Sequence, residues 1–222
     1  MHLPIWIRAG AGIVLVGLAA WHASAVAQQA PRREALAKVI EGVTDPDPLV
    51  RLANLEDVIK RGNATEMQLA IKAAMASSDP DLRSVALRGY MAGVRELYLE
   101  SKPAPDTAAR LADPDDNGAD IGPLRQNVAT WATVTGGRLH VRVEKMDAAT
   151  GRFSAYGMNR LEKIDDSVRG DGQVIGTRVR MSFAIYGLRR CTVELAPSSA
   201  LVLEGAAACD NMPRMLLSMP MY

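Results

Sequence analysis

A short acidic stretch holds the side chains best suited to bind a metal ion. Residues 113–120 read Asp-Pro-Asp-Asp-Asn-Gly-Ala-Asp. Calcium prefers hard oxygen ligands at alternate positions, with glycine at a sharp turn between them. The position where a calcium loop would carry its bidentate glutamate is Leu124. We therefore interpret the stretch as an acidic, proline-bounded linker turn and expect no cofactor. Calcium binding is the alternative, and its ligands would be Asp113, Asp115, Asn117 and Asp120.

The chain has only three histidines with which to bind a metal or catalyse a reaction. Cleavage of an N-terminal signal would remove His2 and His22 and leave His140. We expect His140 on the exposed polar face of a strand, beside Arg142 and Glu144. One histidine cannot build a zinc site alone, and no nucleophile-elbow pattern occurs. The sequence therefore disfavours most zinc enzymes and histidine-dependent hydrolases.

Two further clusters could do chemistry, but each has a simpler interpretation. Asp165, Asp166 and Asp171 could supply the acid and base of glycoside hydrolysis, although adjacent acids in a glycine-bearing loop are usually solvated. The methionines near the end of the chain could hold copper(I) through their thioethers or form the core of a last strand. They are Met212, Met215, Met219 and Met221.

Cys191 and Cys209 are the two cysteines of the chain. An even number of cysteines in an exported protein indicates a disulfide. Both residues fall in the inward-facing set of a predicted strand. The alternative is a metal-binding or catalytic thiol pair, which the spacing disfavours because it is not Cys-x-x-Cys. We therefore predict a Cys191–Cys209 disulfide.

Residues 1–27 have the three parts of a secretory signal peptide. Arg8 precedes the apolar segment 11–21, and small residues at 24–27 lead to a cleavage point before Gln28. The apolar segment is about half of the ~20 residues that a membrane-spanning helix needs, so an uncleaved anchor is the weaker alternative. We expect a periplasmic or secreted protein without a membrane span after cleavage.

The charge balance argues against nucleic acid as a partner. Loss of Arg8 would leave 25 basic and 25 acidic residues. Non-specific binding to nucleic acid needs clustered positive charge, so a neutral chain gives no reason to expect it.

Residues 31–101 are predicted to be helical, because their apolar residues recur at helical spacing. One predicted apolar stripe, expected to be buried, runs from Val50 through Ala53 to Ile59. A fourth, longer helix would extend as far as Leu97 and Tyr98. Asp47-Pro48 and Asp79-Pro80 each place a capping carboxylate before proline at a first helical position.

These helix starts belong to a repeat. The segment Asp-Pro-Leu-Val-Arg at 47–51 recurs as Asp-Pro-Asp-Leu-Arg at 79–83, and each copy precedes an apolar helix. The pattern resembles that of HEAT-like helical repeats. This resemblance implies stacked helix pairs in which the aspartates and arginines of the motif join neighbouring repeats. Those residues, for which it implies a structural role, are Asp47, Arg51, Asp79 and Arg83.

The rest of the chain changes in composition and period. Residues 102–127 are rich in proline and acidic residues and are predicted to be a linker with a short helix around 107–111. Residues 128–222 alternate with a period of two, which predicts about six strands with one apolar face. Residues 147–151 are predicted to form a hairpin turn with glycine at its end. The fold class expected is α+β, a helical HEAT-like repeat domain followed by a small antiparallel β-barrel or sandwich.

The function expected from these features is that of an exported, non-catalytic interaction or scaffold protein. Stacked helix pairs mostly serve as contact surfaces, so its partner would be another exported or envelope protein. One alternative is a β-barrel protein of the periplasm that binds a small ligand inside the barrel. The other is a carboxylate-based enzyme.

Overall fold

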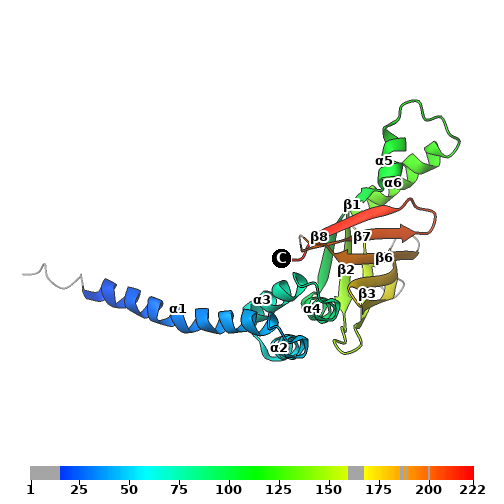
Figure 1. The fold of residues 1–222 in the computed structure, drawn as a ribbon. Coiled ribbons are helices and arrows are strands. Elements are labelled where there is room, and N and C mark those ends of the chain that lie inside the picture. Colours follow the sequence, from blue (N-terminus) through cyan, green and yellow to red (C-terminus); the bar gives the residue numbers. More distant parts are fainter. Residues whose placement is uncertain (1–15, 160–167, 186–187, 189, 200) are drawn as a thin grey trace, which may run out of the picture.

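The structure is a computed structural model that describes residues 16–159, 168–185, 188, 190–199 and 201–222, with side chains from residue 30 onward. Four helices come first (Figure 1): α1 (Val16–Val43), α2 (Pro48–Arg61), α3 (Ala64–Met75) and α4 (Pro80–Gly93). Helices α1 and α2 form one pair, and α3 and α4 form a second. The two pairs stack, because α1 packs against α3 and α2 packs against α4. This is the arrangement that the repeated motif predicted.

The Asp-Pro motifs begin α2 and α4 as expected. Asp47 accepts a hydrogen bond from the Leu49 amide, and Asp79 accepts two from Asp81 and Leu82. Each carboxylate thus satisfies backbone donors that the first turn of a helix leaves free. The helix starts are therefore fixed locally, by residues adjacent in the sequence.

The described residues then form a closed antiparallel barrel of eight strands in sequence order. The strands are β1 (Glu96–Pro103), β2 (Arg138–Glu144), β3 (Arg152–Met158), β4 (Arg169–Ile175), β5 (Arg178–Ala184), β6 (Arg190–Pro197), β7 (Val202–Cys209) and β8 (Met215–Pro220). Strand β8 pairs with β1 and closes the barrel. Closure leaves no unpaired edge strand. The predicted α+β class with a barrel is confirmed.

Side chains fill the interior of the barrel. All eight strands contribute inward residues to one hydrophobic core that also includes residues of α2, α3 and α4. An eight-stranded barrel has an interior just wide enough for its side chains or for one small ligand. Glycine is needed at two tight inward positions, because a Cβ at Gly172 would overlap the Phe153 ring and one at Gly205 would overlap the Glu194 carbonyl oxygen.

Helices close both ends of the barrel. A hairpin of α5 (Pro105–Ala112) and α6 (Ile121–Thr135) is inserted between β1 and β2. It lies at one end of the barrel, and the first four helices lie at the other (Figure 1). The Trp131 side chain of α6 is 1% exposed and belongs to the core. The helices therefore share one hydrophobic core with the barrel.

Several sequence-based expectations were wrong in detail. Residues 96–103 form β1 instead of continuing a fourth helix, because Gly93 ends α4 and Leu97 and Leu99 then alternate with exposed residues. The predicted linker contains α5, which includes the short helix expected around 107–111, and the first part of α6. Strand β4 begins in a stretch that was expected to be a glycine-bearing loop.

The N-terminal expectation concerns residues that the structure describes only in part. Residues 1–15 lie outside the described range, and α1 runs through the predicted cleavage point. Among the described residues, no helix has an apolar stretch long enough to cross a membrane. The signal peptide stays a prediction.

Candidate interaction surface

The two helix pairs are joined by the residues that the repeat motif singled out. Arg51 Nη2 donates a hydrogen bond to Asp79 Oδ2 at 2.9 Å, and both side chains are about one-fifth exposed. Arg51 also donates to the carbonyl oxygen of Asp45. The Arg51 hydrogen bond is the main reason that the pKa of Asp79 lies below its ordinary value. The arginine of the first repeat thus binds the capping aspartate of the second.

The arginine of the second repeat reaches the barrel instead. Arg83 Nη2 lies 3.5 Å from the carbonyl oxygen of Pro197, at the end of β6. Nearby, Arg88 Nη1 donates to the carbonyl oxygen of Ala149 in the β2–β3 turn at 3.1 Å. The barrel therefore occupies the place that a third helix pair would take in a longer stack.

The first repeat has no such cover among the described residues. Asp47 uses one carboxylate oxygen to cap α2, and no ion pair to this carboxylate is formed within the described chain. Leu49 beside it is 76% exposed, Val50 is 41% exposed and Ile40 of α1 is 40% exposed. We call the surface of Ile40, Asp47, Leu49 and Val50 the open end of the stack.

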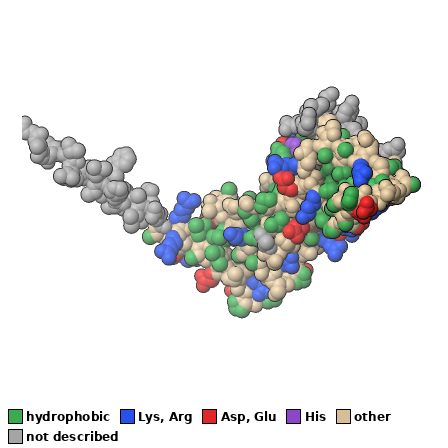
Figure 2. Space-filling view, turned by 90° about the horizontal axis from the view of Figure 1, so that it is seen from above, with side chains coloured by type: hydrophobic (Ala, Val, Ile, Leu, Met, Phe, Trp, Pro, Cys, Tyr) green, Lys and Arg blue, Asp and Glu red, His purple; other side chains and the backbone are tan. Residues whose placement is uncertain are grey.

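Sequence reasoning missed this surface, because it placed Val50 and Ala53 in a buried stripe of α2. Both residues are exposed, and the covered side of α2 centres on Leu55, which is fully buried. Figure 2 shows hydrophobic side chains interspersed with acidic and basic ones over the helical part of the molecule. Glu41, Asp45 and Asp47 make the α1–α2 turn acidic. The open end is thus apolar at its centre and acidic at its rim.

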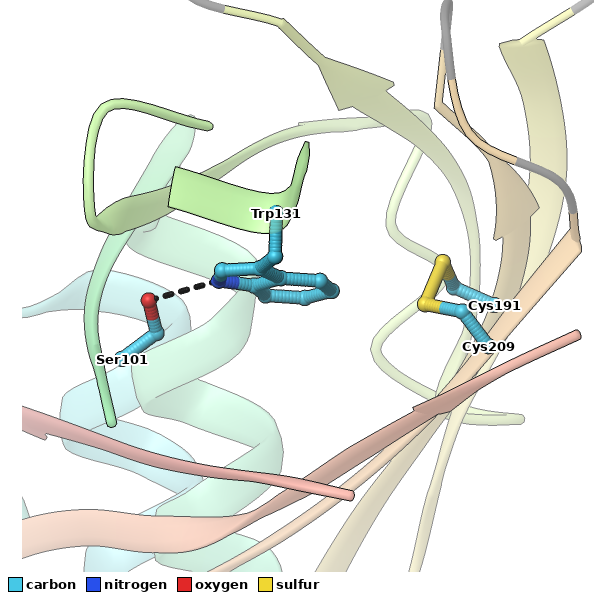
Figure 3. Close-up of a disulfide and its surroundings, with 4 residues drawn as sticks. All are labelled: Ser101, Trp131, Cys191 and Cys209. Atoms are coloured by element: carbon cyan, nitrogen blue, oxygen red, sulfur yellow. Dashed lines mark hydrogen bonds between the residues drawn. A yellow bond between two sulfur atoms is a disulfide. The ribbon is translucent and has the colours of Figure 1, made fainter. Parts of the chain in front are cut away.

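The disulfide between Cys191 and Cys209 is formed, as predicted. The two residues are directly opposite in the β6–β7 ladder, with their Cα atoms 4.0 Å apart. Figure 3 shows the Trp131 ring reaching from α6 toward this disulfide, with Ser101 on its other side. Trp131 Nε1 donates to Ser101 Oγ at 2.9 Å. The disulfide and the indole thus lie on the same side of the barrel interior.

One of the predicted calcium ligands, Asp120, is bound by an arginine that the sequence analysis did not consider. Arg110 of α5 donates to both carboxylate oxygens of Asp120, at 2.7 and 2.9 Å, and to Asp116 at 3.0 Å. These bonds lower the pKa of both aspartates. Asp113 accepts a bond from the Asp115 amide. Calcium at Asp113, Asp115, Asn117 and Asp120 stays a prediction, and it would have to displace Arg110.

Two further observations concern metal coordination in the part of the chain that the structure describes. Within it, no group of three or more histidine, cysteine, aspartate or glutamate side chains could hold an ion. Of the methionines considered for copper, Met215 and Met221 are buried in the core, and Met212 and Met219 pack against it. Their place agrees with the core interpretation.

His140 is buried, which corrects the expectation of an exposed residue. It is 8% exposed, and its ring stacks on that of Tyr98, with the two centroids 4.3 Å apart. Tyr98 donates to Glu96 at 2.5 Å, and His140 Nε2 lies 3.6 Å from the same carboxylate oxygen. The Tyr98 hydrogen bond is the main cause of the lowered pKa of Glu96. Tyr98 of the neighbouring strand β1 thus covers the histidine, and the period-two pattern of β2 alone does not predict this contact.

The carboxylates considered for catalysis are not brought together by the described residues. Asp165 and Asp166 lie outside the described range. Asp171 lines a cleft of about 560 Å³ on the outer face of β3–β6, together with Arg152, Arg180, Ser182 and Thr192. It is the one acidic side chain among the described residues of that cleft. Because Asp165 and Asp166 lie outside the described residues, the two-carboxylate site that glycoside hydrolysis requires stays an untested alternative.

Comparisons with protein-family models, with curated proteins and with solved structures found no match to this chain. The likeness to HEAT-like repeats therefore rests on the two stacked helix pairs and on the Arg51–Asp79 bridge between them.

Proposed function

We propose that this chain is an exported, non-catalytic interaction protein that binds another exported or envelope protein through the open end of its helical stack. The observation that carries the proposal is the unequal cover of two equivalent helices. Leu82 of the second repeat is 1% exposed, whereas Val50, which stands at the same place in the motif, is 41% exposed. One end of the stack is complete, and the other presents apolar side chains.

The way in which helical repeats stack supports a partner at this end. A stack of helix pairs buries a continuous core, and its terminal units need a polar outer face to stay soluble. The exposed apolar side chains of Leu49, Val50 and Ile40 do not provide such a face. Binding would remove this apolar surface from water, which is favourable.

The charge around the open end indicates the chemistry of the partner. Glu41, Asp45 and Asp47 form an acidic rim. Asp47 has the same position in the first repeat as Asp79, which binds Arg51, has in the second. A second copy of the same surface would bring like charges together. A partner surface that presents arginine or lysine around an apolar centre fits better.

Export is supported by the disulfide, because disulfides form and persist in oxidising compartments. A ligand inside the barrel is not favoured, since the inward side chains of all eight strands are buried in the core. Catalysis by paired carboxylates stays the weaker alternative, and Asp165 and Asp166, which it needs, lie outside the described residues.

Native mass spectrometry of the protein purified gently from its own envelope extract tests the proposal. The wild type should carry a co-purifying polypeptide, and Leu49→Asp should lose it. Ile175→Asp is the matched control, since it replaces an exposed apolar residue on the barrel, and it should retain the partner. A bare wild-type monomer, or a partner that persists in Leu49→Asp, would contradict the proposal.

A further inference from the structure

A cavity lies where α2, α4 and the β2–β3 turn meet. Its volume is about 450 Å³, within the ~300–1,000 Å³ that small-molecule sites occupy. Ile59 of α2, Val85 and Gly89 of α4 and Ala148 of the turn supply apolar walls. The cavity thus sits between the helical part and the barrel, a position where ligand sites often occur.

The walls are held in place by contacts that do not depend on a ligand. The side chain of Ile59 lies against Gly89, since a Cβ at that position would lie 2.6 Å from Ile59 Cδ1, so α2 and α4 approach closely beside the cavity. Arg88 fixes the β2–β3 turn through the Ala149 carbonyl oxygen, and Asp147 Oδ1 accepts bonds from the amides of Ala149 and Thr150. The cavity is therefore pre-formed, which limits the entropy lost on binding.

The polar groups at the cavity carry an excess of positive charge. Lys60 and Arg88 line it with a single acidic residue, Glu56. Lys60 lies 3.4 Å from Glu56, and the two side chains are 71% and 46% exposed. An exposed pair of this kind contributes little free energy, so Lys60 can turn to an anion. Arg88 commits Nη1 to Ala149 and keeps its charge at the cavity wall.

We propose that this cavity binds a small amphipathic anion, a carboxylate with a hydrocarbon tail. The tail would contact Ile59, Val85 and Ala148, and the carboxylate would face Lys60 and Arg88. The site is separate from the open end of the stack and does not depend on the proposed protein partner. It also differs from a ligand site inside the barrel, whose interior is filled.

Titration with dodecanoate, followed by calorimetry on the full mature chain, tests this site. The wild type should bind one dodecanoate, and dodecanol, which has the same tail without the charge, should bind more weakly. Lys60→Gln should weaken dodecanoate about fivefold, as expected for the loss of a partly exposed charge pair. Lys72→Gln, on the exposed face of α3, should leave the affinity unchanged.

Blocking the cavity gives an independent readout. Ala148 is exposed in the turn, so Ala148→Trp can fill the cavity without entering the core. It should abolish binding, whereas Ala112→Trp, at the exposed end of α5, should not. Absence of dodecanoate binding to the wild type, equal binding of dodecanol, or unchanged binding in Ala148→Trp would each overturn the proposal.

Discussion

Helices α2 and α4 begin with the same motif, yet they lie in different surroundings. Both start with a capping aspartate and a proline, and both carry arginine at the fifth position. Asp79 is bound by Arg51, and the side of α4 that carries Leu82 is buried against the rest of the protein. Asp47 only caps its own helix, and Leu49 and Val50 face solvent.

The difference separates what a motif does locally from what it does between units. Capping needs only the aspartate and the amides that follow it, so both copies cap. Joining two units needs a neighbour, and within the described chain only the second copy has one on each side. The first copy is built for a contact that these residues do not complete, which is why we assign it to a partner.

The largest contrast is expected between alanine substitutions at equivalent positions. Leu82→Ala should lower the free energy of unfolding by about 2–5 kcal/mol, because it leaves a cavity in a buried site. Val50→Ala should change it by no more than about 0.5 kcal/mol, as for other exposed positions. Urea denaturation of both variants measures this. Similar losses of unfolding free energy would mean that α2 and α4 are equally covered, which would contradict the assignment of an open end.

Loss of the disulfide should loosen the barrel that covers the second repeat. The double substitution Cys191→Ala with Cys209→Ala should lower the free energy of unfolding by about 2–4 kcal/mol. Amide hydrogen exchange should rise most in β6 and β7, which the disulfide joins, and less in α1 and α2. An exchange increase confined to the first helix pair would show that the barrel end is not what the disulfide secures.

A smaller contrast is expected between the two aspartates. Asp79→Asn and Asp47→Asn both keep a capping side chain, but only Asp79→Asn removes an ion pair with Arg51. Thermal denaturation at neutral pH should show a lower midpoint for Asp79→Asn than for Asp47→Asn. Equal midpoints would indicate that the Arg51–Asp79 bridge does not join the repeats.

The same bridge predicts a dependence on pH. Folding lowers the pKa of Asp79 below its ordinary value of 3.8, chiefly through the Arg51 hydrogen bond. The ionised carboxylate therefore adds stability above that ordinary value, and the addition is lost as the pH falls through the lowered pKa. The wild type should thus lose its advantage over Asp79→Asn on acidification. A difference that stays constant from neutral pH to acid would contradict this linkage.

The features that the sequence predicted correctly depend on local chemistry or strict alternation. The caps at Asp47 and Asp79 involve residues two or three apart, and the inward positions around Val141 and Val193 follow from a period of two. The disulfide followed from an even cysteine count. Such signals are carried by short stretches of chain, so no tertiary information was needed.

The features that were missed depend on what packs beside an element. Helical periodicity cannot say which side of α2 is covered, so Val50 was placed in the core. Burial of His140 depends on Tyr98, which lies in a strand first expected to be helix. The bond from Arg110 to Asp120 joins residues ten apart in the sequence, so the acidic stretch alone did not indicate it.

The most direct test of the open end is site-specific photo-crosslinking at the two equivalent positions of the repeat. A photoreactive amino acid would replace Leu49 in one variant and Asp81, the exposed residue at the same place in the second copy, in the other. Crosslinking in the native envelope should give one discrete adduct with another exported protein from position 49 and none from position 81. No adduct at position 49, or the same adducts from both positions, would contradict the claim that the first repeat is the binding surface.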